Sequence, residues 1–197
     1  MYVDVVVGLG RMQPLFTIHA GEYLAGLHVQ QHLKLNAWIP AKDIGIDLLV
    51  TDKENRHAVS LQVKYGKDYL PDKKNRDFRP KFRCLSWFSL NRAKLDASRA
   101  DFWVFVLHGF ESDAPDFVVI PTVELRRRIR EIHGADTAML QCYLSSTKED
   151  ECWETRGLSS SEIMNQIASG THGDPARDFT SYLNENGWAA IASRLTG

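Results

Sequence analysis

Two segments in which apolar and polar residues alternate place the strongest constraint on the fold of this chain. They are I-G-I-D-L-L-V-T at 44–51 and A-V-S-L-Q-V-K-Y at 58–65, separated by the polar stretch D-K-E-N at 52–55. A period of two residues is typical of a β-strand, because successive side chains point to opposite faces. Two such runs joined by a short polar turn predict a β-hairpin.

The hairpin brings polar side chains of complementary chemistry together. Asp47 lies on the first strand, and Gln62 and Lys64 stand two positions apart on the second, so both project from the same face. A carboxylate, an amide oxygen and an ammonium group can together hold Mg²⁺, which prefers oxygen ligands and retains water. The lysine can steer that water or stabilise charge in a transition state. The alternative is that these are ordinary polar residues on an exposed face.

A helix is expected before the hairpin, from about Ile18 to Asn36. Apolar residues recur there at the spacing i, i+3, i+4 and i+7 of an amphipathic helix, namely at Ala20, Tyr23, Leu24 and Leu27. Glu22 stands in the segment A-G-E-Y-L-A-G, whose small residues would let this helix lie close against a sheet.

These residues together resemble the PD-(D/E)XK nuclease superfamily, which has the restriction-endonuclease-like fold. Its members carry a glutamate on a helix, an aspartate on a strand, and E-x-K or Q-x-K on the following strand. The matching positions here, which we call the quartet, are Glu22, Asp47, Gln62 and Lys64. The chain is similar in particular to bacterial nuclease-like domains with G-I-D and Q-x-K-x-G-x-x-Y, since it has G-I-D at 45–47 and Q-V-K-Y-G-K-D-Y at 62–69. The resemblance covers about residues 18–122.

The resemblance implies an Mg²⁺-dependent nuclease, with Mn²⁺ as a substitute ion and DNA as the favoured substrate. Asp47 would be the central metal ligand, together with the side-chain oxygen of Gln62 and the backbone carbonyl of Val63. Glu22 would bind a water on that ion or a second ion, and Lys64 would orient the attacking water.

Two residues depart from the superfamily pattern. Gln62 replaces the commoner glutamate, which removes a negative charge and should weaken metal binding, although active Q-x-K members exist. Tyr65 is bulky where small residues are usual. Gln62 keeps open a second class of function: a catalytically inactive module of the same fold that binds nucleic acid or a protein partner in a defence or mobile-element system.

A polar loop at 66–83 follows directly after Lys64. Lysine and arginine contact phosphates, and Tyr69, Phe78 and Phe82 could stack on exposed bases. The residues expected to bind nucleic acid are Lys67, Tyr69, Lys73, Lys74, Arg76, Arg79, Lys81 and Arg83. The alternative is a solvated loop. A solvated helix face is also the expectation for a second basic cluster, Arg126, Arg127, Arg128 and Arg130.

The remaining segments predict an α/β (α+β) fold in which helices flank a mixed central β-sheet. We expect helices at about 86–98, 121–130 and 178–194, and strands at 2–7, 101–108 and 117–120. The run D-F-W-V-F-V-L-H (101–108) is apolar throughout, which is typical of a strand buried on both faces. A length of 197 residues suits a single domain. Its nuclease-like core would cover 18–134, with a helical C-terminal extension over 135–197.

Charge is distributed unevenly along the chain. Residues 1–100 contain 16 Lys and Arg against 10 Asp and Glu, whereas residues 101–197 contain 8 against 15. The basic half could therefore face a polyanion. Alternatively, folding interleaves the two halves on one mixed surface.

Several other classes of protein are disfavoured. The three cysteines are widely spaced and form no C-x-x-C pair, which supports neither a disulfide framework nor a cysteine zinc site. No segment approaches the roughly 18 apolar residues of a membrane span, and the first residues carry an acid where a signal peptide needs basic charge. We expect a cytoplasmic protein that binds nucleic acid and no membrane, with a homodimer as one open oligomeric state.

A pair of histidines raises a third functional class. His28 and His32 have the i, i+4 spacing of a helical zinc pair. The zinc-peptidase motif needs a glutamate directly after the first histidine, and Val29 stands there. These histidines are therefore expected on a helix surface rather than in a zinc hydrolase.

Overall fold

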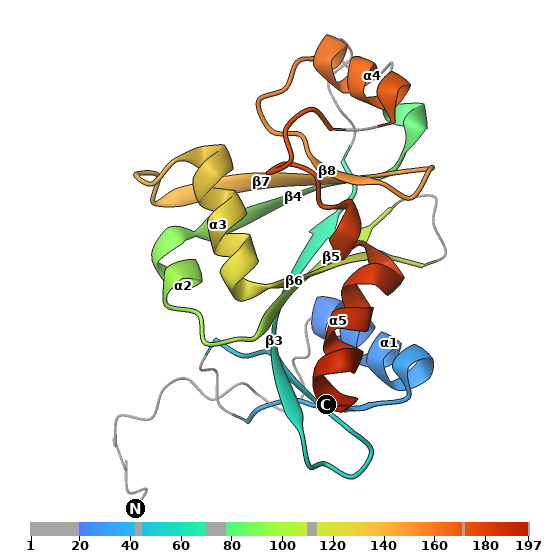
Figure 1. The fold of residues 1–197 in the computed structure, drawn as a ribbon, viewed down its shortest axis with the longest axis vertical. Coiled ribbons are helices and arrows are strands. Elements are labelled where there is room, and N and C mark those ends of the chain that lie inside the picture. Colours follow the sequence, from blue (N-terminus) through green and yellow to red (C-terminus); the bar gives the residue numbers. More distant parts are fainter. Residues whose placement is uncertain (1–19, 42–44, 70–77, 110–113, 171, 197) are drawn as a thin grey trace, which may run out of the picture.

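The hairpin predicted from the sequence is confirmed, and it belongs to a five-stranded mixed sheet (Figure 1). β2 (Leu48–Thr51) and β3 (Ala58–Lys67) pair antiparallel, and β1 (Asn36–Trp38) adds to the outer side of β2. On the other side, β5 (Phe102–His108) runs parallel to β3, and β6 (Asp116–Pro121) runs antiparallel to β5. The strand order is β1-β2-β3-β5-β6.

The molecule is known from a computed structural model. It describes residues 20–41, 45–69, 78–109, 114–170 and 172–196. The strand expected at 2–7 lies outside these ranges. Within them, no helix is both long enough and apolar enough to cross a membrane.

A second, three-stranded antiparallel sheet stacks on the first. It contains β4 (Phe82–Asn91), β7 (Met139–Thr147) and β8 (Cys152–Glu154), in the order β4-β7-β8. The helix expected at 86–98 is therefore wrong over most of its length, since only α2 (Arg92–Asp96) is helical there. β4 forms because Phe88 and Leu90 can be buried between the sheets while Trp87 and Ser89 face outward.

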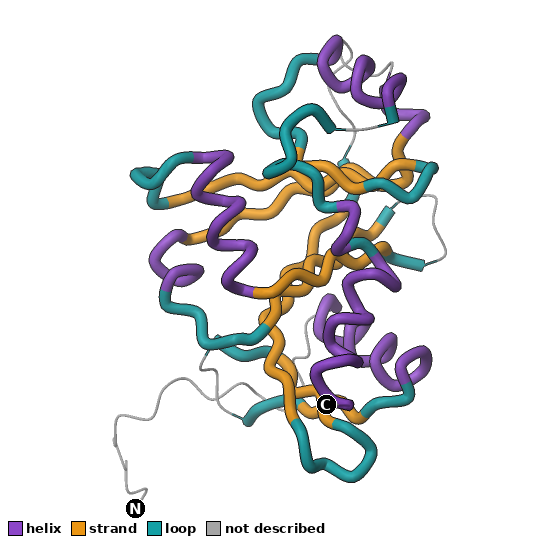
Figure 2. The backbone as a smooth tube through the Cα atoms, in the orientation of Figure 1, coloured by secondary structure: helices purple, strands orange, loops and turns teal. Residues whose placement is uncertain are grey.

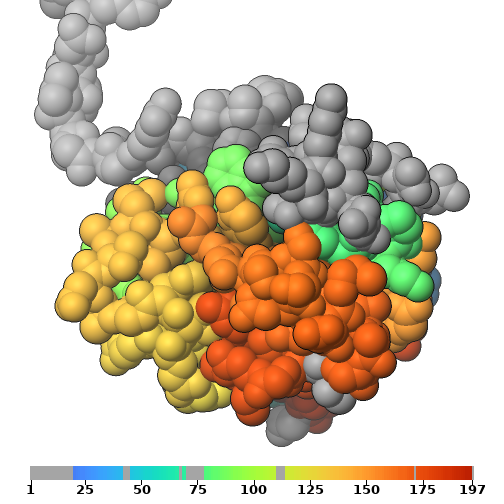
Figure 3. Space-filling view, turned by 90° about the horizontal axis from the view of Figure 1, so that it is seen from above, coloured from blue at the N-terminus to red at the C-terminus, as the bar shows by residue number. Residues whose placement is uncertain are grey.

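The expected C-terminal extension is not purely helical, because β7 and β8 lie within it. β7 pairs with β4 along its whole length, from Asn91 beside Met139 to Phe82 beside Thr147. The segment from 135 onward is thereby hydrogen-bonded to an element of the first half of the chain. Seen from above, residues of the C-terminal part of the chain make most of the described surface (Figure 3).

Helices cover the two stacked sheets (Figure 2). α1 (Ala20–His28), which continues into the π-helical turn η1 (Val29–Leu33), and α5 (Asn184–Thr196) pack on one face of the five-stranded sheet. α3 (Thr122–His133) and α2 pack into the core between the sheets from one side, and α4 (Ser160–Ser169) covers the outer face of the three-stranded sheet. A short 3-10 turn, η3 (Thr180–Tyr182), precedes α5.

β5 confirms the expectation of a strand buried on both faces. Trp103, Phe105 and Leu107 pack toward the three-stranded sheet, and the alternate residues Val104 and Val106 pack toward α1 and α5. All five side chains are at most 3% exposed. The two hydrophobic cores of the protein therefore meet at this strand.

His28 lies in the contact between α1 and α5. Its ring stacks on that of Trp188, with ring centroids 4.8 Å apart, and on that of His32, at 4.6 Å. Burial, with a smaller contribution from the charge of His32, lowers the pKa of His28 to about 4. The uncharged imidazole is thus the form that the folded protein favours.

Acidification should weaken this contact. The unfolded chain protonates His28 near pH 6.5 and the folded chain near pH 4, so the unfolding free energy that depends on this residue falls between these values. The variant His28→Phe keeps a stacking ring and removes the titration. Its urea-unfolding free energy relative to the wild type should rise as pH is lowered from about 6.5 to about 4. A difference that stays constant over this interval would contradict the low pKa.

Candidate active site

Asp47 is fixed at the point where the hairpin opens. It directly precedes β2, and its backbone N–H donates to the carbonyl of Leu61 at 2.8 Å. Its carboxylate oxygen Oδ2 accepts a 2.7 Å hydrogen bond from the backbone N–H of Val63 and another from the side-chain amide of Gln62. The side chain is held by both strands and is only 7% exposed. Gly45, with φ of +79°, provides the left-handed turn that leads into it.

β3 presents the next two members of the quartet. Gln62 and Lys64 stand beside Trp103 and Phe105 of β5 in the parallel register. The ammonium nitrogen of Lys64 lies 5.6 Å from the centroid of the Trp103 ring, within cation–π range. The buried indole is itself anchored, since its Nε1 donates to the hydroxyl of Ser98 at 3.2 Å.

The backbone carbonyl of Val63 faces the same side as Asp47. The carbonyl of Leu61 and the N–H of Val63 both bond to Asp47, and in a strand the N–H and C=O of one residue point toward the same neighbouring strand. The Val63 carbonyl therefore also points toward this edge, where β2 has not yet begun.

Glu22 reaches the hairpin because α1 lies close to β3. A Cβ atom on Gly21 would be only 2.8 Å from the Cβ of Tyr65 and 3.4 Å from a methyl of Val63, so only glycine permits this approach. Glu22, the next residue, is 5% exposed. The small residues that the sequence places around Glu22 thus have a direct steric role.

All four members of the quartet line one cavity of about 630 Å³, which we call the central cavity. β4 and α2 provide its opposite wall. That wall was not predicted from the sequence, because residues 86–91 were expected to be helical and form the end of β4 instead. The lining residues that were not anticipated include Ser89, Asn91, Lys94, Ser98, Trp103 and Met139.

The donor set of the cavity fits a hard divalent cation. It comprises the carboxylates of Glu22 and Asp47, the amide of Gln62 and the carbonyl of Val63, all of which offer oxygen, the ligand that Mg²⁺ prefers. The amide of Gln62 now donates to Asp47, so a half-turn about its last side-chain bond would present its oxygen instead. In the part of the chain that the structure describes, no three His, Cys, Asp or Glu side chains gather as a metal-binding group.

Several residues of the predicted nucleic-acid-binding loop have structural roles instead. Phe78 and Phe82 are 6% and 1% exposed in the core beneath α4, so the expectation that they stack on bases is wrong. Tyr69 is half-buried, and burial is the main factor that raises its pKa to about 12. Arg79 pairs with the buried Asp68 at 2.5 Å. Lys81 is exposed.

Arg83 shows how the basic and acidic halves of the sequence interleave. It pairs with Asp116 at 3.1 Å and with Asp150 at 2.5 Å, both from the acidic half. Its charge is thus already offset, unlike that of a free phosphate-binding group. Three of the basic residues lie outside the described ranges, and the side chain of a fourth is not described; they are Lys73, Lys74, Arg76 and Lys67.

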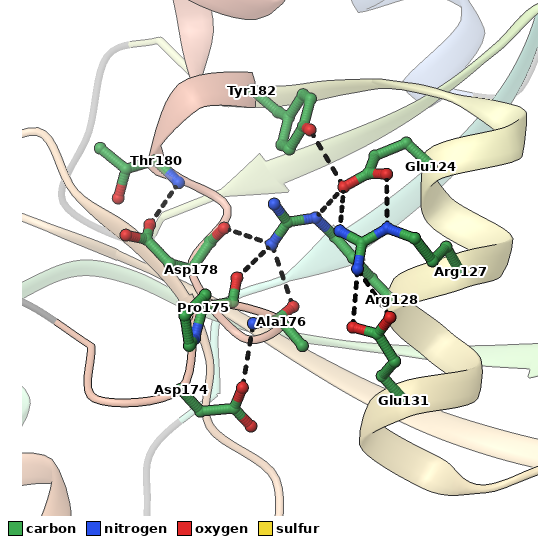
Figure 4. Close-up of polar contacts among 10 residues, drawn as sticks. All are labelled: Glu124, Arg127, Arg128, Glu131, Asp174, Pro175, Ala176, Asp178, Thr180 and Tyr182. Carbon is green, nitrogen blue, oxygen red and sulfur yellow. Dashed lines mark hydrogen bonds and ion pairs between the residues drawn. The ribbon is translucent and has the colours of Figure 1, made fainter.

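The arginines of α3 form a solvated face only in part: Arg127 and Arg130 are exposed as expected, whereas Arg128 and Arg126 have structural roles. Arg128 is 8% exposed, and its Nη1 donates to three backbone carbonyls of the segment before α5 at 2.6–3.0 Å (Figure 4). Arg127 bonds Glu124 and Glu131 and is the main reason that the pKa of Glu124 falls to about 2. Arg126 donates to the carbonyls of Leu95 and Ser98 and so ties α3 to the wall of the central cavity.

No family model, curated protein or solved structure matches this chain. The arrangement of the quartet in the central cavity is therefore the main observation that bears on function.

The close approach of α1 to β3 can be tested with two glycines of the same helix. Gly21→Ala should push α1 away from Tyr65 and lower the unfolding free energy by about 1–3 kcal/mol, the usual cost of overpacking. In the control Gly26→Ala, the new Cβ would lie 3.9 Å from Ala37, an ordinary contact, and should stabilise the helix by up to about 1 kcal/mol. Urea unfolding measures both. Equal stability of the two variants would show that α1 is not packed as described.

Proposed function

We propose that this protein is an Mg²⁺-dependent nuclease with a restriction-endonuclease-like fold, which hydrolyses phosphodiester bonds, with DNA as the favoured substrate. The observation that carries the proposal is the convergence of the quartet. Glu22 comes from a helix, Asp47 from the position just before a strand, and the Q-x-K residues from the next strand, yet all line one cavity. This is the arrangement that the resemblance to the PD-(D/E)XK superfamily implies.

Each member of the quartet has a role that its position supports. Asp47, the Val63 carbonyl and a rotated Gln62 would hold the ion, with Glu22 beside them. When bound, such an ion polarises a phosphoryl oxygen and lowers the pKa of a coordinated water.

Lys64 supplies the only positive charge within the quartet. Its ammonium group would orient the attacking water and offset negative charge that develops on the phosphate. Trp103 holds the Lys64 side chain over its ring and so restricts where the ammonium can lie.

A non-catalytic module of the same fold is the alternative, and one observation favours it. The amide of Gln62 already satisfies Asp47 by a hydrogen bond, so the site is internally paired without any cation. A metal titration distinguishes the two, because a binding module would retain nucleic acid equally well with Mg²⁺ and with a chelator.

Two substitutions test the catalytic assignment. Asp47→Ala should abolish Mg²⁺-dependent cleavage of plasmid and single-stranded DNA, because it removes the central ligand. Lys64→Ala should lower the rate by about 10²–10³, as expected for the loss of one transition-state donor. Lys53→Ala, which removes a lysine from the exposed hairpin turn, is the matched control and should cleave like the wild type. Undiminished cleavage by the Asp47 variant would assign the activity to another site or to a contaminant.

Gln62→Glu tests the metal site without an activity assay. A carboxylate beside Asp47 should repel it, so the metal-free variant should melt at a lower temperature than the wild type. Mn²⁺ should bind the variant more tightly and restore its stability, with heats measurable by calorimetry. Gln62→Ala serves as the control, since it removes the amide without adding charge. Equal, negligible heats of Mn²⁺ binding for the wild type and Gln62→Glu would favour the non-catalytic module over the nuclease.

A further inference from the structure

The acidic half of the quartet lies deep in the protein, while Gln62 and Lys64 are half-buried. The two acidic members, Glu22 and Asp47, are only 5% and 7% exposed. Across the central cavity from the Gln62 and Lys64 face stand the end of β4 and the helix α2. A substrate must therefore enter between two walls before its phosphate can reach the acidic groups.

A second, smaller hollow adjoins the central cavity. Its volume is about 300 Å³, and it is lined by the start of α1 and by Val63 and Tyr65 of β3. Glu22, Val63 and Lys64 line both spaces and so form their shared boundary. The Tyr65 side chain is held in place by a 2.7 Å hydrogen bond between its hydroxyl and His108.

The dimensions of these two spaces restrict what can bind. Pockets that enclose a small organic ligand measure about 300–1,000 Å³, so the central cavity suits a group of the size of one or two nucleotides. A duplex keeps its bases stacked and paired. Enzymes with a pocket of this kind act on single strands or extrude a nucleotide from the helix at a cost of a few kcal/mol.

We propose that the substrate is an unpaired strand, which passes from the smaller hollow into the central cavity and presents the bond to be cleaved at Glu22 and Lys64. This inference rests on the proposed nuclease function and adds the class of substrate. It also assigns a binding role to the opposite wall, which lies outside the quartet.

The opposite wall has the chemistry to hold such a strand. Lys94 of α2 is an exposed residue that lines the central cavity. Lys94 offers a positive charge to a phosphate neighbouring the bond to be cleaved, and Met139, 56% exposed at the same cavity, offers apolar contact to a base. Lys94 thus becomes a specificity residue for the strand, while Lys64 acts at the reacting phosphate.

Binding is measured first, with the Asp47→Ala protein and a chelator so that no cleavage occurs. A short fluorescein-labelled single-stranded DNA should bind about tenfold or more tightly than the same sequence as a blunt duplex, a free-energy difference of about 1.4 kcal/mol. Adding Lys94→Ala should weaken single-strand binding and reduce the slope of log affinity against log salt by about 0.7, the value for one lost phosphate contact. Adding Lys53→Ala instead should leave the affinity for the single strand unchanged.

A second variant changes the exposed Met139, which is placed to contact a base. Met139→Glu should weaken single-strand binding about tenfold or more with a melting temperature close to that of the parent, because this side chain is 56% exposed and a carboxylate there would repel the phosphates of the strand. Equal affinity for strand and duplex, or binding that neither Lys94→Ala nor Met139→Glu changes, would overturn the inference.

Cleavage by the wild type with Mn²⁺ then separates failure of the inference from failure of the proposed function. Faster, Asp47-dependent cleavage of the single strand supports both. Asp47-dependent cleavage of the duplex at an equal or higher rate overturns the inference and leaves the nuclease assignment standing. Cleavage of neither, with Lys94-dependent binding of the single strand, overturns the nuclease assignment and supports the cavity as a single-strand site.

Discussion

Strand β5 is buried on both faces, and it pairs in parallel with β3. Parallel strands cannot be joined by a tight turn, so the chain between them must cross over the sheet. In this protein the crossover contains β4 and α2, and β4 packs on β5 through the Phe88 and Phe105 rings, 4.9 Å apart. The same crossover forms the far wall of the central cavity. The burial of one strand thus decides the shape of the candidate active site.

The neutral side chain of Gln62 has a consequence for how the site is assembled. An amide can donate to Asp47, whereas a glutamate at this position would place two like charges side by side. The hairpin can therefore fold with its acidic group satisfied before any cation binds. The same neutrality removes part of the attraction for the cation, so binding of the ion is expected to rely more on the phosphate oxygens that a substrate brings.

Charged residues hold the C-terminal segment in place. Arg128 donates to backbone carbonyls that have no partner within a helix or strand, and such bonds from a buried arginine are costly to remove. Arg177 bonds the fully buried Glu154 at 2.5 Å and joins the same segment to β8. The sequence pattern counts Arg128 in a basic cluster, because the carbonyls that accept its hydrogen bonds are distant along the chain.

The sequence by itself determined the hairpin, the buried strand β5, the adjoining strand β6 and the residues of the quartet, because each depends on a short-range period or motif. The extent of β4 and the existence of the three-stranded sheet were decided by the tertiary structure alone. The sequence of residues 86–91 is compatible with a helix or a strand, and only pairing with β7, some 50 residues away, selects the strand. The depth of the candidate site follows from the strand conformation of these residues. The end of β4 and α2 form the wall opposite Gln62 and Lys64, and this wall encloses the cavity.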